Sequence, residues 1–350
     1  MVTKIIHADR ETITPDDLAE AGEIIRGGGL VAFPTETVYG LGGNALDPDA
    51  SARIYAAKGR PSDNPLIVHI ADMSELAPLA NEIPPMAKSL AGRWWPGPMT
   101  LIMKKSPAVP RATTGGLETV AVRMPSHPVA AALIRAAGVP IAAPSANLSG
   151  RPSPTSASHV IEDLDGRVDM IIDGGNSDIG LESTIIDLTG EEPELLRPGF
   201  VTIEEIRALT GSAGVDPAVF APPSEDLRPK APGMKYRHYA PKAPLTIVEG
   251  EAEAVAARIG GLCREAAASG KRCGVICSRQ MAGRIDAPLI RILGEEGSAD
   301  DAARSLFAAL REMDEKEADL IYAESLPDEG LGMAVMNRLR KAAGYNIIRV

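Results

Sequence analysis

Short apolar segments alternate with amphipathic segments through the first 210 residues. Apolar runs such as LVAF at 30–33 and PLIVHI at 65–70 predict buried strands, because they are short and rich in branched side chains. The segment 14–26 predicts a helix, because it opens with Thr14 and Pro15 and ends at three glycines. Further strands are expected at 3–8, 100–105, 119–124, 139–145, 168–173, 184–189 and 194–197, and further helices at 47–58, 127–137, 156–164 and 202–210. This order predicts an α/β domain over residues 1–210.

The periodic pattern stops at residues 211–243, which are rich in proline, glycine and serine and predict a linker. It resumes over residues 244–350. Strands are expected there at 245–249, 272–277, 289–293, 319–324 and 346–349, with helices at 251–269, 299–315 and 332–343. Strands that alternate with helices predict a second, smaller α/β domain with a doubly wound parallel sheet.

Composition narrows the class of protein. The formal net charge is −11, which argues against tight non-specific binding of nucleic acid. No apolar run approaches the roughly 20 residues of a membrane span, and the N-terminus lacks the apolar core of a signal peptide, so we expect a cytoplasmic protein. The only cysteines are Cys263, Cys273 and Cys277; this sparse, odd set predicts buried structural thiols and neither a disulfide framework nor a metal site.

Polar stretches follow several of the expected strands. In PTETVYGLG (34–42), Thr35 and Thr37 offer hydroxyls beside glycines that let a ligand approach the backbone, although an ordinary turn has the same composition. In KGRPSDNP (58–65), Lys58 and Arg60 suit a phosphate, although basic residues at a helix end also complement its dipole. Neither stretch decides the function by itself.

Charged and small polar residues mark the other strand ends. Arg123 and Arg197 each end an apolar strand just before a proline, where a charge needs a partner or a ligand. His69 lies within a strand, where a histidine is more often structural. The turn APSANLSG (143–150) carries Ser145 and Asn147, a composition that also fits a plain Asx turn. Taken together at the ends of an α/β sheet, these groups predict a ligand with phosphates and a small polar part.

Several motifs carry a resemblance to a known family. PTETVYGLG, KGRPSDNPLIVHI, RWWPGPMTLI, VAVRMPSHP and APSANLSGRPSPTSA occur in this order, while neither a P-loop nor an H-E-x-x-H motif occurs. Residues 5–210 resemble the YrdC/Sua5 family of threonylcarbamoyl-AMP synthases, and the tail to Val350 resembles its longer Sua5 form. The resemblance implies a twisted mixed sheet with a concave cationic face, followed by a Rossmann-like C-terminal domain.

The same resemblance implies a reaction. L-Threonine, bicarbonate and ATP, with Mg²⁺ on the phosphates, would give threonylcarbamoyl-AMP and pyrophosphate, and the product would pass to the machinery that makes t6A in tRNA. The family's Lys-x-Arg and Ser-x-Asn signature falls on Lys58, Arg60, Ser145 and Asn147. Threonine would contact Thr35, His69, Arg123, Ala143 and Ser183. ATP would contact Lys58, Arg60, Asn64, Thr119, Ser145, Ser153 and Arg197.

The stretch APGMKYRHYAP (231–241) holds two of the six tyrosines and is interpreted as a lid, with Tyr236 or Tyr239 against the nucleotide. A passive tether is the alternative. Two other functions stay open. One is a carbamoyltransferase-like enzyme, and the other is a non-catalytic module of this fold that binds tRNA or double-stranded RNA.

Overall fold

The computed structural model describes residues 2–222, 229–235 and 238–350. The chain divides into two compact units, Met1–Ser149 with Ser153–Tyr236, and Gly150–Pro152 with Arg237–Val350. The three residues Gly150–Pro152 therefore group with the second unit. There Ala240 N donates to the carbonyl of Gly150 at 2.9 Å, and Arg311 Nη2 donates to that of Pro152 at 2.7 Å. No described helix has the length and apolar content of a membrane span.

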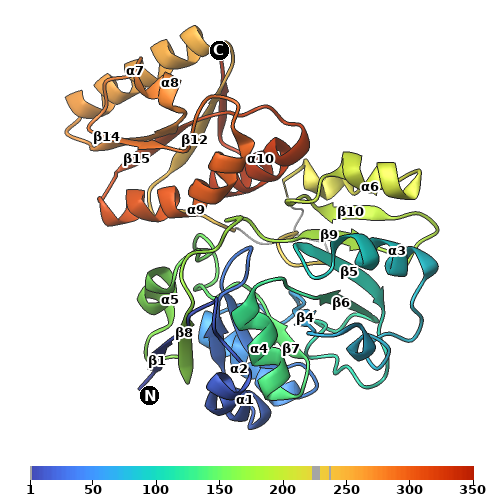
Figure 1. Cartoon of the computed structure of the whole chain (residues 1–350). Coiled ribbons are helices and arrows are strands. Elements are labelled where there is room, and N and C mark those ends of the chain that lie inside the picture. Colours follow the sequence, from blue (N-terminus) through green and yellow to red (C-terminus); the bar gives the residue numbers. More distant parts are fainter. Residues whose placement is uncertain (1, 223–228, 236–237) are drawn as a thin grey trace. The chain divides into compact units, whose positions relative to one another are not determined.

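The first unit is built on a mixed sheet of eleven strands (Figure 1) in the order β1-β8-β2-β3-β7-β4-β6-β5-β9-β10-β11. Parallel pairs such as β4–β6 and antiparallel pairs such as β5–β6 both occur, which confirms the expected mixed sheet. The strands are β1 (Lys4–His7), β2 (Val31–Phe33), β3 (Gly40–Asn44), β4 (Ile67–His69), β5 (Met99–Lys104), β6 (Thr119–Arg123), β7 (Ile141–Ala143), β8 (Met170–Asp173), β9 (Thr184–Asp187), β10 (Glu194–Arg197) and β11 (Gly214–Val215).

Most helices of this unit begin and end close to the start and stop signals in the sequence. Asp47 caps α2 by accepting from the amide of Asp49, and Gly59 ends that helix with a left-handed φ of 62°. The expected helix at 14–26 is a 3₁₀ turn followed by α1, and Asp72 caps another 3₁₀ turn. The α-helices are α1 (Ala19–Arg26), α2 (Pro48–Lys58), α3 (Pro85–Trp94), α4 (Pro128–Ala137), α5 (Ala157–Leu164) and α6 (Ile203–Thr210), and the 3₁₀ turns are η1 (Asp16–Leu18), η2 (Met73–Glu75) and η3 (Pro217–Val219).

Strands β3 and β11 and helix α3 were not predicted. The sequence of β3 is GLGGN, and glycine is depleted from strands. Packing explains the glycine here, because a Cβ on Gly42 would lie 2.7 Å from Ile141 Cγ2 and 2.9 Å from Phe33 Cε1.

Register places the polar strand ends on one face of this sheet. Paired residues of neighbouring strands point to the same side. His69 pairs with Arg123, Ile67 pairs with Ala121, and Ile67 also pairs with Ala143. These five side chains therefore share a face, which we call the site face.

Two groups of residues pack against the site face. Helices α1 and α4 pack on one half, in a core cluster that includes Phe33, Ile141 and Ala143. On the other half, Ala231 and Met234 of the predicted linker are buried in a cluster with strand residues. This second cluster consists of Ile67, Ile102, Ala121, Ile185, Leu196, Ala231 and Met234.

The second unit has a five-stranded, fully parallel sheet in the order β14-β13-β15-β12-β16 (Figure 1). The chain crosses one way through α7 and α8 and returns through α9 and α10, so these pairs of helices cover opposite faces. This arrangement confirms the expected doubly wound domain. Its elements are β12 (Leu245–Glu249), α7 (Ala252–Ala268), β13 (Cys273–Cys277), α8 (Arg279–Ala282), β14 (Leu289–Ile292), α9 (Ala299–Glu315), β15 (Leu320–Glu324), α10 (Gly330–Ala342) and β16 (Ile347–Arg349).

The three cysteines are free thiols in the core of this unit. Cys263 of α7 packs with Cys273 and Cys277 of β13 in one apolar cluster. Cys273, Val275 and Cys277 all join this cluster, as the period of two along a strand predicts.

Candidate active site

Arg123 is the centre of a buried polar cluster at the carboxyl end of β6. Its Nη2 lies 2.7 Å from Glu36 Oε1, its Nη1 donates to Thr37 Oγ1 at 2.8 Å, and its Nε donates to the carbonyl of Gly97 at 3.2 Å. Burial would raise the pKa of the Glu36 carboxyl, but the charge and hydrogen bonds of Arg123 outweigh it and hold that pKa below its ordinary value. The buried guanidinium is therefore neutralised by a carboxylate that the sequence analysis did not select.

Thr35 and Thr37 are joined by their hydroxyls, which lie 2.8 Å apart. Thr35 Oγ1 also accepts from the amides of Thr37 and Val38, both at 3.2 Å. Both threonines are buried. The stretch that follows β2 is thus a folded hydroxyl turn connected to Arg123 through Thr37.

His69 lies beside Arg123 as its register partner on β4. Its Nδ1 is 3.1 Å from the carbonyl of Ile67, and since a carbonyl only accepts, Nδ1 carries the proton and Nε2 is left as an acceptor. Burial, assisted by the charge of Arg123, lowers the pKa of His69 to about 3. The imidazole is consequently neutral near pH 7.

Lys58, Ser145 and Asn147 meet where α2 ends and β7 leaves the sheet. The buried Lys58 Nζ donates to the main-chain carbonyls of Ser145 and Asn147, and Asn147 Oδ1 lies 3.4 Å away. Ser145 Oγ donates to the same Asn147 oxygen at 2.5 Å. The structure therefore brings together three of the four signature residues.

The fourth signature residue, Arg60, is anchored to its own loop. Its Nε and Nη2 donate to the carbonyls of Asn64 and Pro65 at 3.3 and 3.1 Å. Asn64 is 1% exposed, and its Oδ1 has no hydrogen-bond partner among the described residues. A buried polar atom without a partner is costly, which marks Asn64 as a group that a ligand would satisfy.

Arg197 and Ser183 form the opposite flank. Arg197 Nε donates to the Ser183 carbonyl and Nη2 to its Oγ, each at 3.0 Å. The Ser183 hydroxyl also lies 2.7 Å from Thr100 Oγ1, and Thr100 is the register partner of Ile185 in the site-face cluster. Arg197 pairs with Ile185 as well, so this flank belongs to the site face.

The remaining predicted residues are placed as follows. Thr119 begins β6 and lies on the site face with Arg123, four residues along the same strand. Ala143 ends β7 on that face. Ser153 is buried and donates to Glu182 Oε1 at 2.5 Å.

Tyr236 lies outside the described residues. Tyr239 belongs to the second unit, where its buried ring packs on Phe307 with 5.1 Å between centroids.

Three partners of the predicted residues were missed, namely Glu36, Thr100 and Glu182. Glu36 lies inside the motif PTETVYGLG, and Glu182 directly precedes Ser183. A buried cation such as Arg123 needs a carboxylate partner. The acid in PTETVYGLG, a stretch otherwise rich in hydroxyl groups, was therefore the signal that could have identified Glu36. No comparable signal singled out Thr100, which reads as an ordinary strand residue.

Comparison with known proteins identifies the family of this chain. A family model described as "Telomere recombination" matches residues 23–199, and one described as "Threonylcarbamoyl-AMP synthase, C-terminal domain" matches residues 201–344. A threonylcarbamoyl-AMP synthase of Pyrococcus abyssi is 54% identical over 341 residues, covering 97% of this chain and 98% of that protein. One of Bacillus subtilis is 51% identical over 342 residues, covering 97% of each.

A solved structure extends the likeness to the backbone. The crystal structure of P. abyssi Sua5 complexed with L-threonine matches with a TM-score of 0.94 at 54% identity, covering 99% of this chain and all of that one. Both domains are therefore shared with a full-length relative. The chain belongs to the YrdC/Sua5 family of threonylcarbamoyl-AMP synthases, which are nucleotidyltransferases, in the long form with a C-terminal domain.

Proposed function

We propose that the site face binds L-threonine and ATP and, with bicarbonate, forms threonylcarbamoyl-AMP and pyrophosphate. The observation that carries this proposal is the placing of His69, Arg123 and Arg197 on one face of the sheet. Hydroxyl and imidazole groups suited to an amino acid lie there beside buried guanidinium groups suited to anions.

Threonine is assigned to the part of the face around Arg123. Two N–H groups of its guanidinium donate to Thr37 and Gly97, while Nη2, which is ion-paired with Glu36 at 2.7 Å, makes no hydrogen bond among the described residues and has N–H groups to offer a carboxylate. The Nε2 of His69 offers an acceptor for a hydroxyl or ammonium group. Thr35, Ala143 and Ser183 are proposed to complete the amino-acid site.

ATP is assigned to Lys58, Arg60, Asn64, Thr119, Ser145, Ser153 and Arg197. The Asn64 Oδ1 without a partner supports this assignment, because a nucleotide donor would satisfy it. Within the described residues no three acids, histidines or cysteines form a metal site. Mg²⁺ is accordingly proposed to arrive on the triphosphate, where it would neutralise phosphate charge.

The reaction needs positioning more than a protein nucleophile. The amine of threonine adds to CO₂ derived from bicarbonate, and the resulting carbamate oxygen attacks the α-phosphorus of ATP while pyrophosphate leaves. The reacting groups are anionic, and their approach costs Coulomb energy that cations must offset. Lys58, Arg60 and Arg197 are proposed to supply that stabilisation.

The domain roles remain part of the proposal: a catalytic domain at 1–210, a lid at 211–243 and a C-terminal domain at 244–350. Two contacts within the first unit support a lid. Ala231 and Met234 pack in the cluster on the site face, and Lys235 Nζ lies 3.6 Å from Asp63 Oδ2, beside Asn64. Tyr236 or Tyr239 is proposed to contact the nucleotide when the lid closes, and Tyr239 would first have to leave its packing against Phe307.

Transfer of the product to the tRNA threonylcarbamoyl transferase machinery, a weak contact with tRNA and a cytoplasmic location are proposed from the family alone. Salt-dependent binding of tRNA tests the contact with RNA. A chain that bound RNA but released no pyrophosphate would be a binding module, and one that consumed carbamoyl phosphate would be a carbamoyltransferase.

The direct test is pyrophosphate release with threonine, bicarbonate and ATP omitted in turn. We expect release only when all three are present. Arg60→Ala should abolish release while the thermal transition stays, and Arg167→Ala, which changes an exposed arginine of the same unit, should leave the rate unchanged. Release without threonine, or full activity of Arg60→Ala, would contradict the proposal.

A further inference from the structure

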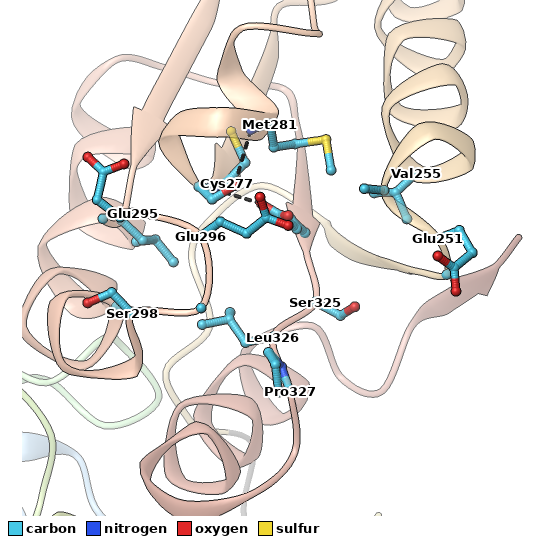
Figure 2. Close-up of a pocket in the computed structure, with 18 residues that line it drawn as sticks. Glu251, Val255, Cys277, Met281, Glu295, Glu296, Ser298, Ser325, Leu326 and Pro327 are labelled. Atoms are coloured by element: carbon cyan, nitrogen blue, oxygen red, sulfur yellow. Dashed lines mark hydrogen bonds between the residues drawn. The ribbon is translucent and has the colours of Figure 1, made fainter.

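A cavity of about 380 Å³ lies at the carboxyl ends of the parallel strands of the second unit (Figure 2). Its walls come from the loops that follow β12, β13, β14 and β15, at 250–252, 277–278, 293–298 and 324–327. The proposed synthase reaction assigns no residue of this cavity. Its size is that of a pocket for a small molecule.

The topology of the sheet explains why a cavity forms there. Strands β13 and β15 are neighbours, but the chain leaves β13 toward β14 and leaves β15 toward β16, on opposite sides. The two loops diverge and leave a crevice between Cys277 and Glu324. Ligands of open α/β sheets bind at such a switch point.

The charged side chains that line the cavity are all acidic. Its lining includes Glu251, Glu295, Glu296 and Glu324 and contains no lysine, arginine or histidine. Glu295 is already paired with Arg279 Nε at 2.6 Å, and Glu324 Oε2 accepts from the amide of Ser278 at 2.7 Å.

Glu251 and Glu296 have no side-chain hydrogen bond or ion pair among the described residues. Figure 2 shows the Glu296 side chain projecting into the middle of the cavity. Its negative charge therefore faces a space that the fold leaves open.

This lining does not suit a phosphate. Amide groups at helix starts usually supply phosphate sites, but at the starts of α8 and α9 serine oxygens already accept from them. Ser278 Oγ accepts from the amide of Met281 at 3.2 Å, and Ser298 Oγ accepts from that of Asp301 at 3.4 Å. Burial raises the pKa of the Cys277 thiol to about 12, so this thiol adds no charge.

The remaining walls are apolar, with Val255, Met281, Leu293 and Ala302 all buried. Since no three metal-ligating side chains cluster in the described part of the chain, an organic cation fits better than a metal ion. We propose that this cavity binds a small aliphatic amine in its protonated form, with the ammonium group at Glu296 and the hydrocarbon chain against Met281 and Leu293.

The test uses the full chain labelled at the methionine methyl groups with ¹³C, with the Met281 signal assigned from Met281→Leu. Titration with n-pentylamine should shift the Met281 signal in a saturable way. The neutral isostere 1-pentanol should bind at least about tenfold more weakly, because it lacks the charge. Inorganic phosphate should leave the signal in place.

Two neighbouring glutamates provide matched variants. Glu296→Gln should weaken n-pentylamine binding by about tenfold or more, while Glu295→Gln should retain the affinity because Glu295 is already neutralised by Arg279. The signal of Met336, which is buried in α10, reports whether the unit remains folded. An unmoved Met281 signal, equal binding of pentanol, a shift with phosphate, or unchanged affinity of Glu296→Gln would each overturn the proposal.

Discussion

Arg123 and Glu36 form a 2.7 Å ion pair whose side chains expose only 5% and 7% of their surfaces. Removal of one partner from a buried pair leaves the other charge uncompensated. We therefore expect Glu36→Gln, which keeps the shape, to lower the free energy of unfolding by about 3 kcal/mol. Urea denaturation at pH 7 measures this change.

The control for this variant is another glutamate–arginine pair of the same unit. Glu118 pairs with Arg111 at the surface, where both side chains are largely exposed. Glu118→Gln should change the free energy of unfolding by less than about 1 kcal/mol. Equal losses in the two variants would show that burial of the Arg123 pair has no energetic effect.

His69 predicts a pH dependence of stability. Its pKa of about 3 in the folded chain lies far below the 6.5 of an unperturbed imidazole, so below pH 6.5 the unfolded chain binds the proton first. This histidine has no effect above pH 6.5 and costs stability as the pH falls toward 3. At pH 5 the loss should be about 2 kcal/mol.

The comparison that isolates His69 is His69→Gln. Urea denaturation at pH 7 and pH 5 gives the change in the free energy of unfolding for each chain. The difference between the two changes isolates His69, because the other titrating groups are the same in both chains. The variant should lose about 2 kcal/mol less than the parent between these pH values. Identical losses would mean that His69 is protonated in the folded chain.

Lys58 and Lys105 test whether a lysine bound to carbonyls is part of the chemistry or only of the fold. Lys58 Nζ holds two carbonyls of the Ser145–Asn147 turn, and Lys105 Nζ lies 3.1 Å from the Val109 carbonyl on another loop. Lys58→Met should lower the rate of pyrophosphate release about a hundredfold or more, the scale of a lost charge-stabilising donor. Lys105→Met should leave the rate within a factor of a few, and a similar loss in both would reduce Lys58 to a structural role.

Lys235 tests the lid. Its contact with Asp63 places it beside the Arg60 loop, whereas Lys230, five residues earlier, lies 3.3 Å from Glu194. We expect Lys235→Ala to raise the KM for ATP several-fold and Lys230→Ala to leave it unchanged. Steady-state kinetics at saturating threonine measure both, and equal KM values would favour the passive tether.

The sequence was a good guide where local signals and packing agree. Every strand of the second unit was predicted, because each is a short segment rich in branched apolar residues. The motifs also named Lys58, Ser145 and Asn147, which the fold brings together. Local pattern could not reveal β3, because a side chain on its Gly42 would clash with Phe33 and Ile141 from other strands.

Long-range pairing was equally beyond the sequence pattern. The partner of Arg123 lies 87 residues earlier in a motif chosen for its hydroxyls, and only the strand order brings Glu36 to it. Composition alone described 211–243 as a linker. It could not show that Ala231 and Met234 would be buried against five strands of the sheet.

The burial of Ala231 and Met234 has a consequence for biosynthesis. During translation the strands that contribute Ile67, Ile102 and Ala121 leave the ribosome more than a hundred residues before the chain that covers them. Domains fold in the order in which they leave the ribosome. The nascent protein therefore exposes this apolar surface for many seconds of elongation. A stop codon after residue 210 would make that transient exposure permanent.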